Sequence, residues 1–267
     1  MSTIRVDGTA SIDLQTIDPN DTGHFTDKAN ARELLKLERK RISAVQERLF
    51  AEDRQSLLVV LQATDTGGKD GTIRNVFKGV NPQGCRVWSF GVPTDEELAH
   101  DALWRYHQRT PARGMIEVFN RSQYEEVLVV RVKELVDEAT WMRRYDEIND
   151  FERLLVSNGT RILKFYLHIS KDEQKERLQS RLDEPEKHWK FRAGDLDDRA
   201  RWDDYQVAFE DAINRCATPH APWFVVPANR KWYRNLVVAK TIADALEDMN
   251  PQFPPEELGL DQAVIPD

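Results

Sequence analysis

The residues with the clearest chemistry are an aspartate, a lysine and several glycines that follow one apolar segment. Residues 57–61 form an unbroken apolar run, which predicts a strand buried on both faces. Asp65 and Lys69 come just after it, in a glycine-rich turn that leads into a helical pattern. Glycines let backbone N–H groups surround an anion, while the helix N-terminus and the lysine add positive charge. This order of elements predicts a site for phosphate chains. The predicted phosphate-binding residues of this turn are Gly67, Gly68, Gly71, Thr72 and Arg74.

The turn departs from the common phosphate-loop pattern G-x-x-x-x-G-K-[ST] at two positions. Ala63 replaces the first glycine, and Asp70 stands where the magnesium-binding hydroxyl is expected. Asp65 is an additional carboxylate inside the loop, where it would repel a phosphate unless a cation lay between them. We therefore predict that Asp65 is a Mg²⁺ ligand. The alternative is a tight turn without a ligand, in which Asp65 caps the helix.

A second group of polar residues follows the apolar run 115–119. Arg121 can hold a phosphate with two parallel hydrogen bonds, and it is predicted to be catalytic. In phosphate-loop kinases, the position of Asn120 often carries an acid that orients Mg²⁺. We assign Asn120 to nucleotide binding. Asn120 has no charge to offer a Mg²⁺ ion, and Glu125 and Glu126 could supply that negative charge instead. Glu126 is predicted to be a metal ligand. Alternatively, these acids are ordinary residues of a helix first turn.

The third group is a run of cations between residues 171 and 192. Arg177 and Arg181 are four residues apart, so they share one face of a helix. Two arginines on one edge of a helix after a strand are typical of a lid that closes over transferring phosphates. We predict that Arg181 is catalytic and that Arg177, Lys187 and Lys190 bind the phosphate chain. A solvated helix face with internal ion pairs is the alternative.

Composition narrows the classes of protein further. The chain has 267 residues, enough for one α/β domain, and its net charge of −8 argues against indiscriminate binding to nucleic acid or anionic membranes. No apolar run approaches the ~20 residues of a transmembrane helix, and the first residues lack the apolar core of a signal peptide. Cys85 and Cys216 lack metal-type spacing and fit reduced thiols. We predict a cytoplasmic protein that binds neither nucleic acid nor membrane.

Strands alternate with helices along the chain, which predicts an α/β fold with a five-stranded parallel sheet covered by helices on both faces. Ligands of such sheets bind beyond the carboxyl ends of the strands. We expect strands at 57–63, 85–90, 115–119, 161–169 and 223–227, and helices at 27–51, 69–80, 93–108, 137–157, 170–182, about 199–215, and from about 230 to 249. The predicted parts are an irregular arm (1–25), a single kinase domain (26–250) with a lid at about 170–200, and a mobile tail (251–267).

Taken together, these segments resemble the second polyphosphate kinase family. The resemblance rests on residues 62–71, 119–125, 181–191, 202–205 and 228–235, and it spans roughly residues 25 to 250. It implies a P-loop kinase fold like that of thymidylate kinase, a helical lid, and dependence on Mg²⁺, with Mn²⁺ as an alternative ion. Asn120, Arg121 and Ser122 followed by two acids resemble the third class of the family, whose members accept both AMP and ADP.

The resemblance also implies the reaction and the residues that perform it. Asp65, Lys69, Arg121 and Arg181 would be catalytic in a reversible, direct in-line transfer between inorganic polyphosphate and AMP, ADP or ATP, without a phospho-enzyme. The long helix predicted at 27–51 favours self-association, and we expect a dimer or tetramer. Two other functions stay open: an ATP-dependent nucleoside or nucleotide kinase, and a nucleotide-binding protein without catalysis.

Overall fold

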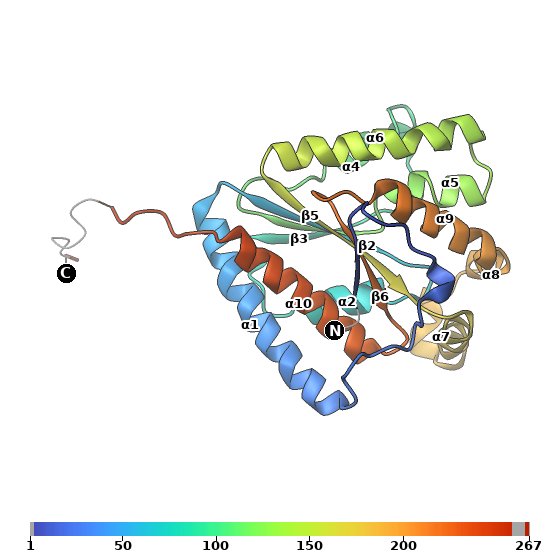
Figure 1. Cartoon of the computed structure of the whole chain (residues 1–267), viewed down its shortest axis with the longest axis horizontal. Coiled ribbons are helices and arrows are strands. Elements are labelled where there is room, and N and C mark those ends of the chain that lie inside the picture. The colour runs from blue at the N-terminus through green and yellow to red at the C-terminus, as the bar shows by residue number, and fades with distance from the viewer. Residues whose placement is uncertain (1–2, 258–264, 267) are drawn as a thin grey trace.

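The computed structural model describes residues 3–257 and 265–266, which fold around a six-stranded sheet (Figure 1). The strand order is β1-β6-β5-β2-β4-β3. The strands are β1 (Ile4–Val6), β2 (Ser56–Gln62), β3 (Cys85–Ser89), β4 (Ile116–Asn120), β5 (Thr160–His168) and β6 (Trp223–Pro227). The α-helices are α1 (Lys28–Glu52), α2 (Lys69–Val76), α3 (Asp95–Leu98), α4 (Trp104–His107), α5 (Val129–Val132), α6 (Glu138–Ser157), α7 (Lys171–Asp183), α8 (Gly194–Ala200), α9 (Trp202–Cys216) and α10 (Lys231–Met249). Short 3₁₀ turns are η1 (Leu14–Thr16), η2 (Gln123–Glu126) and η3 (Pro185–Lys190).

The five predicted parallel strands are confirmed, and the structure adds a sixth. β2 pairs in parallel with β4 and β5, β4 with β3, and β5 with β6. β1 pairs antiparallel with β6, with Ile4 opposite Val225. The predicted arm 1–25 is therefore not wholly irregular. β1 covers the edge that β6 would otherwise expose, and it has only three residues, too few to leave an alternating pattern in the sequence.

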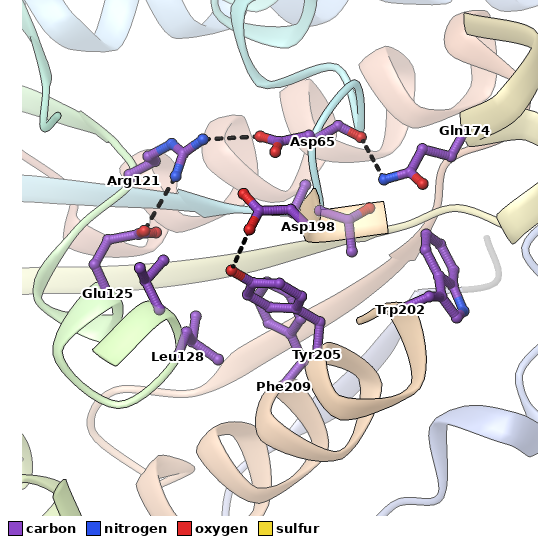
Figure 2. A pocket seen from close by; sticks show the side chains of 12 residues that line it. Asp65, Arg121, Glu125, Leu128, Gln174, Asp198, Trp202, Tyr205 and Phe209 are labelled. Carbon is purple, nitrogen blue, oxygen red and sulfur yellow. Dashed lines mark hydrogen bonds and ion pairs between the residues drawn. The ribbon is translucent and has the colours of Figure 1, made fainter. Parts of the chain in front are cut away.

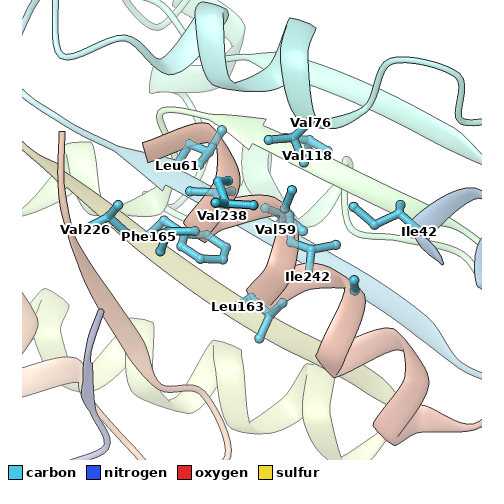
Figure 3. Packing of buried hydrophobic residues seen from close by; sticks show 14 of the residues in the cluster. Ile42, Val59, Leu61, Val76, Val118, Leu163, Phe165, Val226, Val238 and Ile242 are labelled. Carbon is cyan, nitrogen blue, oxygen red and sulfur yellow. The ribbon is translucent and has the colours of Figure 1, made fainter. Parts of the chain in front are cut away.

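The central strand β2 is buried on both faces, as its apolar run predicts. Its side chains alternate between two cores, because successive residues of a strand point to opposite faces. Val59 packs in the core under α1 and α10, where it lies near Val238 and Ile242 (Figure 3). Val60 packs in the other core, with residues of α6 and α9. The molecule thus has three layers, with α1, α2 and α10 on one face and α6 and α9 on the other (Figure 1).

Two predicted helices have different bounds in the structure. The helix expected at 69–80 ends at Val76, before Gly79 adopts a φ of 93°. The helix expected at 93–108 is two short helices, α3 and α4. The carboxylate of Asp101 accepts a hydrogen bond from the Leu103 N–H, and this local turn separates the two helices.

The parallel topology places the functional loops together. The chain turns after β2, β4, β5 and β6 all lie at the carboxyl edge of the sheet, where ligands of this architecture bind. None of the helices in the described part of the chain is long and apolar enough to cross a membrane. The predicted mobile tail lies partly outside the described residues, at 258–264 and 267.

Candidate active site

The loop between β2 and α2 has the shape of a phosphate cradle. Gly68, the residue before α2, is left-handed with a φ of 102°, and the start of the helix has no side-chain cap. The first-turn N–H groups of α2 are therefore open to an anion. The Lys69 Nζ donates to the Ala63 carbonyl over 2.9 Å, which folds the side chain back over the loop. Burial, and then the nearby charge of Arg121, lower the pKa of Lys69 to about 8.

The loop needs its glycines for space as well as for conformation. A Cβ at position 67 would lie 2.4 Å from the Ala63 Cβ, and one at position 68 would lie 1.8 Å from the Arg234 Nη1.

Thr72 corrects a prediction, because both its N–H and its hydroxyl donate to the Gly68 carbonyl. Its donors close the first turn of α2 and are not available to phosphate.

Arg121 joins the phosphate loop to the turn after β4 (Figure 2). Its Nη2 lies 2.8 Å from the Asp65 Oδ1, and its Nη1 lies 3.1 Å from the Glu125 Oε2. These two carboxylates, Glu125 more than Asp65, raise the pKa of the guanidinium, so it stays charged. Arg121 has a φ of 64°, uncommon for a residue with a side chain, and this turn directs the side chain toward the loop. Asp65 and Arg121, which the sequence predicts separately as catalytic residues, are thus in direct contact.

A pocket opens beside this ion pair, and the sequence singled out only part of its lining, Asp65, Arg121 and Glu125, as site residues. One wall is polar and includes the carboxylates of Asp65 and Glu125 (Figure 2). The Tyr205 hydroxyl donates to the Asp198 carboxylate over 3.1 Å. The lining residues are Ala63, Thr64, Asp65, Arg121, Glu125, Leu128, Val129, Gln174, Asp198, Trp202, Tyr205 and Phe209. Trp202 and Tyr205 lie in a segment of the family resemblance, which was the one signal for them in the sequence.

Glu126 does not face this pocket, and Glu125 does. The Glu126 carboxylate lies 2.8 Å from the Arg144 Nη1 and 3.8 Å from the Arg105 Nη2, and it accepts a hydrogen bond from the Tyr106 hydroxyl. Burial raises its pKa. With these partners, Glu126 closes a buried network behind the site. This corrects its predicted role as a metal ligand.

Arg177 also has a different role from the predicted one. Its Nη1 donates to the carbonyls of Thr66 and Gly67, and its Nη2 donates to those of Ala228 and Asn229. Its Nε donates to Glu173 over 2.7 Å. All five N–H donors of the guanidinium are used. Arg177 therefore ties the phosphate loop to the turn after β6 and is not free to bind phosphate.

Most of the remaining predicted residues have polar or aromatic partners of their own. Asn120 donates to the Asp70 carboxylate over 2.7 Å, joining β4 to α2. Arg181 on α7 pairs with Asp195 of α8 at 3.1 Å. Lys187 pairs with Glu184 over 2.5 Å, and Lys190 lies 5.0 Å from the ring centre of Trp189. Arg74 is exposed in the last turn of α2, the far end from the cradle.

A parallel sheet that ends in a glycine loop with a lysine, next to an arginine and an aromatic pocket, is the architecture of phosphate-loop kinases. Residues 25–254 match the family model described as polyphosphate kinase 2. The chain therefore belongs to the polyphosphate kinase 2 family.

Individual relatives are similar over nearly the whole chain. An AMP/ADP-polyphosphate phosphotransferase of Meiothermus ruber is 54% identical over 99% of this chain and 100% of its own length. An ADP-polyphosphate phosphotransferase of Rhodopseudomonas palustris is 45% identical over 86% of this chain and 84% of its own. The crystal structure of polyphosphate kinase 2 from Arthrobacter aurescens is 45% identical, covers 96% of this chain and 92% of its own, and superimposes with a TM-score of 0.92.

Proposed function

We propose that this protein transfers phosphoryl groups reversibly between inorganic polyphosphate and a nucleotide, converting AMP to ADP and ADP to ATP. The observation that carries the proposal is the contact of Asp65 and Arg121 at the mouth of a lysine-bearing phosphate loop. The similarity along the full length of the Meiothermus ruber enzyme, whose name includes both AMP and ADP, supports the two acceptors.

In this proposal the nucleotide occupies the pocket beside Arg121, and the polyphosphate occupies the cradle. Trp202, Tyr205 and Phe209 offer apolar surface for a base or ribose, and Arg121 stands where it meets the phosphate. Asn120, at the end of β4, is the further candidate for nucleotide contact. The cradle amides and Lys69 hold the donor chain, with Lys187, Lys190 and Arg181 supplied from the lid.

Phosphoryl transfer between two polyanions requires neutralisation of their negative charge more than it requires a general base. The terminal phosphate of a nucleotide has a second pKa of about 6, so it is already an anionic nucleophile at neutral pH. The protein must bring two polyanions together and stabilise a metaphosphate-like transition state. Lys69, Arg121 and Arg181 supply positive charge for this, and direct in-line transfer needs no phospho-enzyme.

Asp65 is the candidate metal ligand. Its carboxylate lies inside the phosphate loop and is a hard oxygen donor, which suits Mg²⁺ and also Mn²⁺. The described residues hold no group of three or more His, Cys, Asp or Glu side chains fit to bind a metal. This agrees with Mg²⁺, which commonly binds one or two carboxylates together with substrate phosphates. The ion would neutralise phosphate charge beside Asp65.

One experiment separates the proposed activity from its alternatives. The protein is incubated with polyphosphate, Mg²⁺ and each of AMP, ADP, GMP and GDP without ATP, and the products are separated by chromatography. ADP and ATP formation supports the proposal. Product that forms only when ATP is added would identify an ATP-dependent kinase, and nucleotide binding without product would identify a non-catalytic protein. Labelled polyphosphate without nucleotide should leave no stable label on the protein.

We also propose a cytoplasmic dimer or tetramer. The long helix α1, which carries the exposed apolar side chains Leu37 and Phe50, is the candidate element for self-association. Cys85 and Cys216 are free thiols, in agreement with a reducing compartment. Light scattering after size-exclusion chromatography measures the assembly, and a monomer at micromolar concentration would contradict it.

A further inference from the structure

Arg234 lies directly beneath the phosphate loop. It belongs to the first turn of α10, and it is only 2% exposed. Its Nη1 donates to the Gly67 carbonyl over 3.3 Å. A Cβ at position 68 would lie 1.8 Å from this nitrogen, and a Cβ at position 71 would lie 3.3 Å from the Nη2. The guanidinium therefore supports the inner side of the loop along its glycines.

No described acid neutralises this guanidinium through an ion pair. Besides the Gly67 carbonyl, the Arg234 side chain donates to the neutral Asn235 amide oxygen, from the Nε over 3.2 Å and from the Nη2 over 2.9 Å. The acid whose charge reaches it is Glu173, and that carboxylate already pairs with Arg177. Burial, and then repulsion by Arg177, lower the pKa of Arg234.

The position of Arg234 on its helix increases this electrostatic cost. The N-terminal end of a helix carries partial positive charge and favours acids. The first turn of α10 contains no acid, and it contributes Lys231 and Arg234. A buried charge without an ionic partner is unfavourable in general. An anion bound on the other side of the loop would offset that cost.

The contact with Gly67 also fixes the direction of a loop amide. Arg177 and Arg234 both donate to the Gly67 carbonyl, so this oxygen points inward. In a trans peptide the following N–H points the opposite way. The Gly68 N–H is therefore directed away from the two arginines and toward the side of the loop where an anion binds.

We propose that Arg234 is a positioning residue for polyphosphate, which orients the Gly68 amide and contributes positive charge through the loop without touching the substrate. This inference rests on the proposed function, because it takes polyphosphate as the anion in the cradle. It assigns to Arg234 a specific effect on the donor, since the nucleotide pocket is lined by other residues.

The test compares two variants that separate charge from hydrogen bonding. Arg234→Gln keeps an N–H donor for Gly67 and removes the charge, whereas Arg234→Lys keeps the charge. We expect Arg234→Gln to raise the KM for polyphosphate about tenfold and to leave the KM for AMP within about twofold. A tenfold change is the size expected when one positive charge near a bound anion is lost in a medium of intermediate dielectric constant. Arg234→Lys should recover most of the polyphosphate affinity.

A second readout excludes a merely structural role. The unfolding temperature of the ligand-free Arg234→Gln variant should not fall, since an unpaired buried charge has been removed. The increase in unfolding temperature caused by polyphosphate with Mg²⁺ should shrink. Arg161→Gln, at a surface ion pair with Asp248, is the matched control and should leave both readouts at the wild-type value.

Unchanged polyphosphate KM in a folded Arg234→Gln variant overturns the inference, as does an equal loss for both substrates together with a lower unfolding temperature. If Arg234→Gln does not fold, Arg234→Met, which needs neither charge nor hydrogen bonds, is measured in the same way. Wild-type protein that transfers no phosphate from polyphosphate would reject the proposed function instead. The thermal shift with polyphosphate still reports on Arg234 in that case.

Discussion

Lys69 combines a full positive charge with a position at the start of α2, where backbone N–H groups already favour an anion. We predict that Lys69→Ala lowers kcat/KM for polyphosphate by more than about tenfold, or ~1.4 kcal/mol of barrier. The unfolding temperature should change little, because the hydrogen bond that is lost, from the Lys69 Nζ to the Ala63 carbonyl, lies within the loop. Steady-state kinetics and a thermal melt measure the two quantities. Lys36→Ala on the exposed face of α1 is the control, and a smaller kinetic loss would place the site elsewhere.

The pKa of Lys69 gives a prediction with opposite signs for stability and binding. In the folded, ligand-free protein this pKa is lowered from 10.5 to about 8. Between these two pH values the unfolded state binds more protons than the folded state. This group therefore increases the free energy of unfolding, and so the stability of the fold, as pH rises. Polyphosphate affinity should fall over the same range, because the neutral amine has lost its charge. Denaturant melts and binding titrations from pH 7 to 10 should show both trends in the wild type, and both should be smaller in Lys69→Met.

At the residue scale, the two acids after Arg121 show that a sequence does not determine which of two neighbouring side chains faces a site. The sequence places Glu125 and Glu126 together at the end of a strand, and that prediction is correct as a location. Neighbouring residues of a 3₁₀ turn point in different directions, so only one can face the pocket. The choice depends on Arg144, Arg105 and Tyr106, which come from elsewhere in the chain and bind Glu126.

At the scale of elements, Asn229 connects three segments beside the cradle. Its side chain accepts from the Ser170 N–H at the start of α7, and it donates to the Ser170 hydroxyl and to the Asn20 side chain of the N-terminal segment. We predict that Asn229→Ala lowers the free energy of unfolding by about 1–3 kcal/mol, because buried polar groups lose their partners. Urea denaturation measures the loss. Asn30→Ala, on the exposed first turn of α1, should change it far less, and equal losses would refute the connecting role.

Elements with strong local signals were predicted well. β6 has the predicted bounds, and α6 and α10 end at the predicted residues, because apolar periodicity and end signals such as Asn158 and Gly159 are local. β1 and the pocket beside Arg121 depend on contacts between distant parts of the chain. β1 forms only because β6, more than 200 residues later, offers an edge. The pocket likewise needs α9 to approach the turn after β4, which no local pattern specifies.

For the whole molecule, the net charge of −8 opposes a polyanionic substrate at long range, so binding depends on cations gathered at the carboxyl edge of the sheet. Asp65 is the exception among them, a carboxylate placed inside the phosphate loop. Its repulsion of phosphate is relieved only by a cation. The balance between Asp65 and the basic residues should therefore make polyphosphate binding depend on a divalent metal.

This balance gives a prediction for the stability of the entire chain. A ligand that binds only the folded state stabilises it by about 2.7 kcal/mol at one hundred times its Kd. Polyphosphate with Mg²⁺ should thus raise the unfolding temperature by several degrees, and polyphosphate with EDTA should raise it less.

Asp65→Asn removes the repulsion and the metal ligand together, so its shift with polyphosphate should become nearly independent of Mg²⁺, while transfer activity is lost. An Asp65→Asn variant whose shift still required Mg²⁺ would show that the ion is held elsewhere. The matched variant Asp95→Asn, in the acidic first turn of α3, should behave as the wild type.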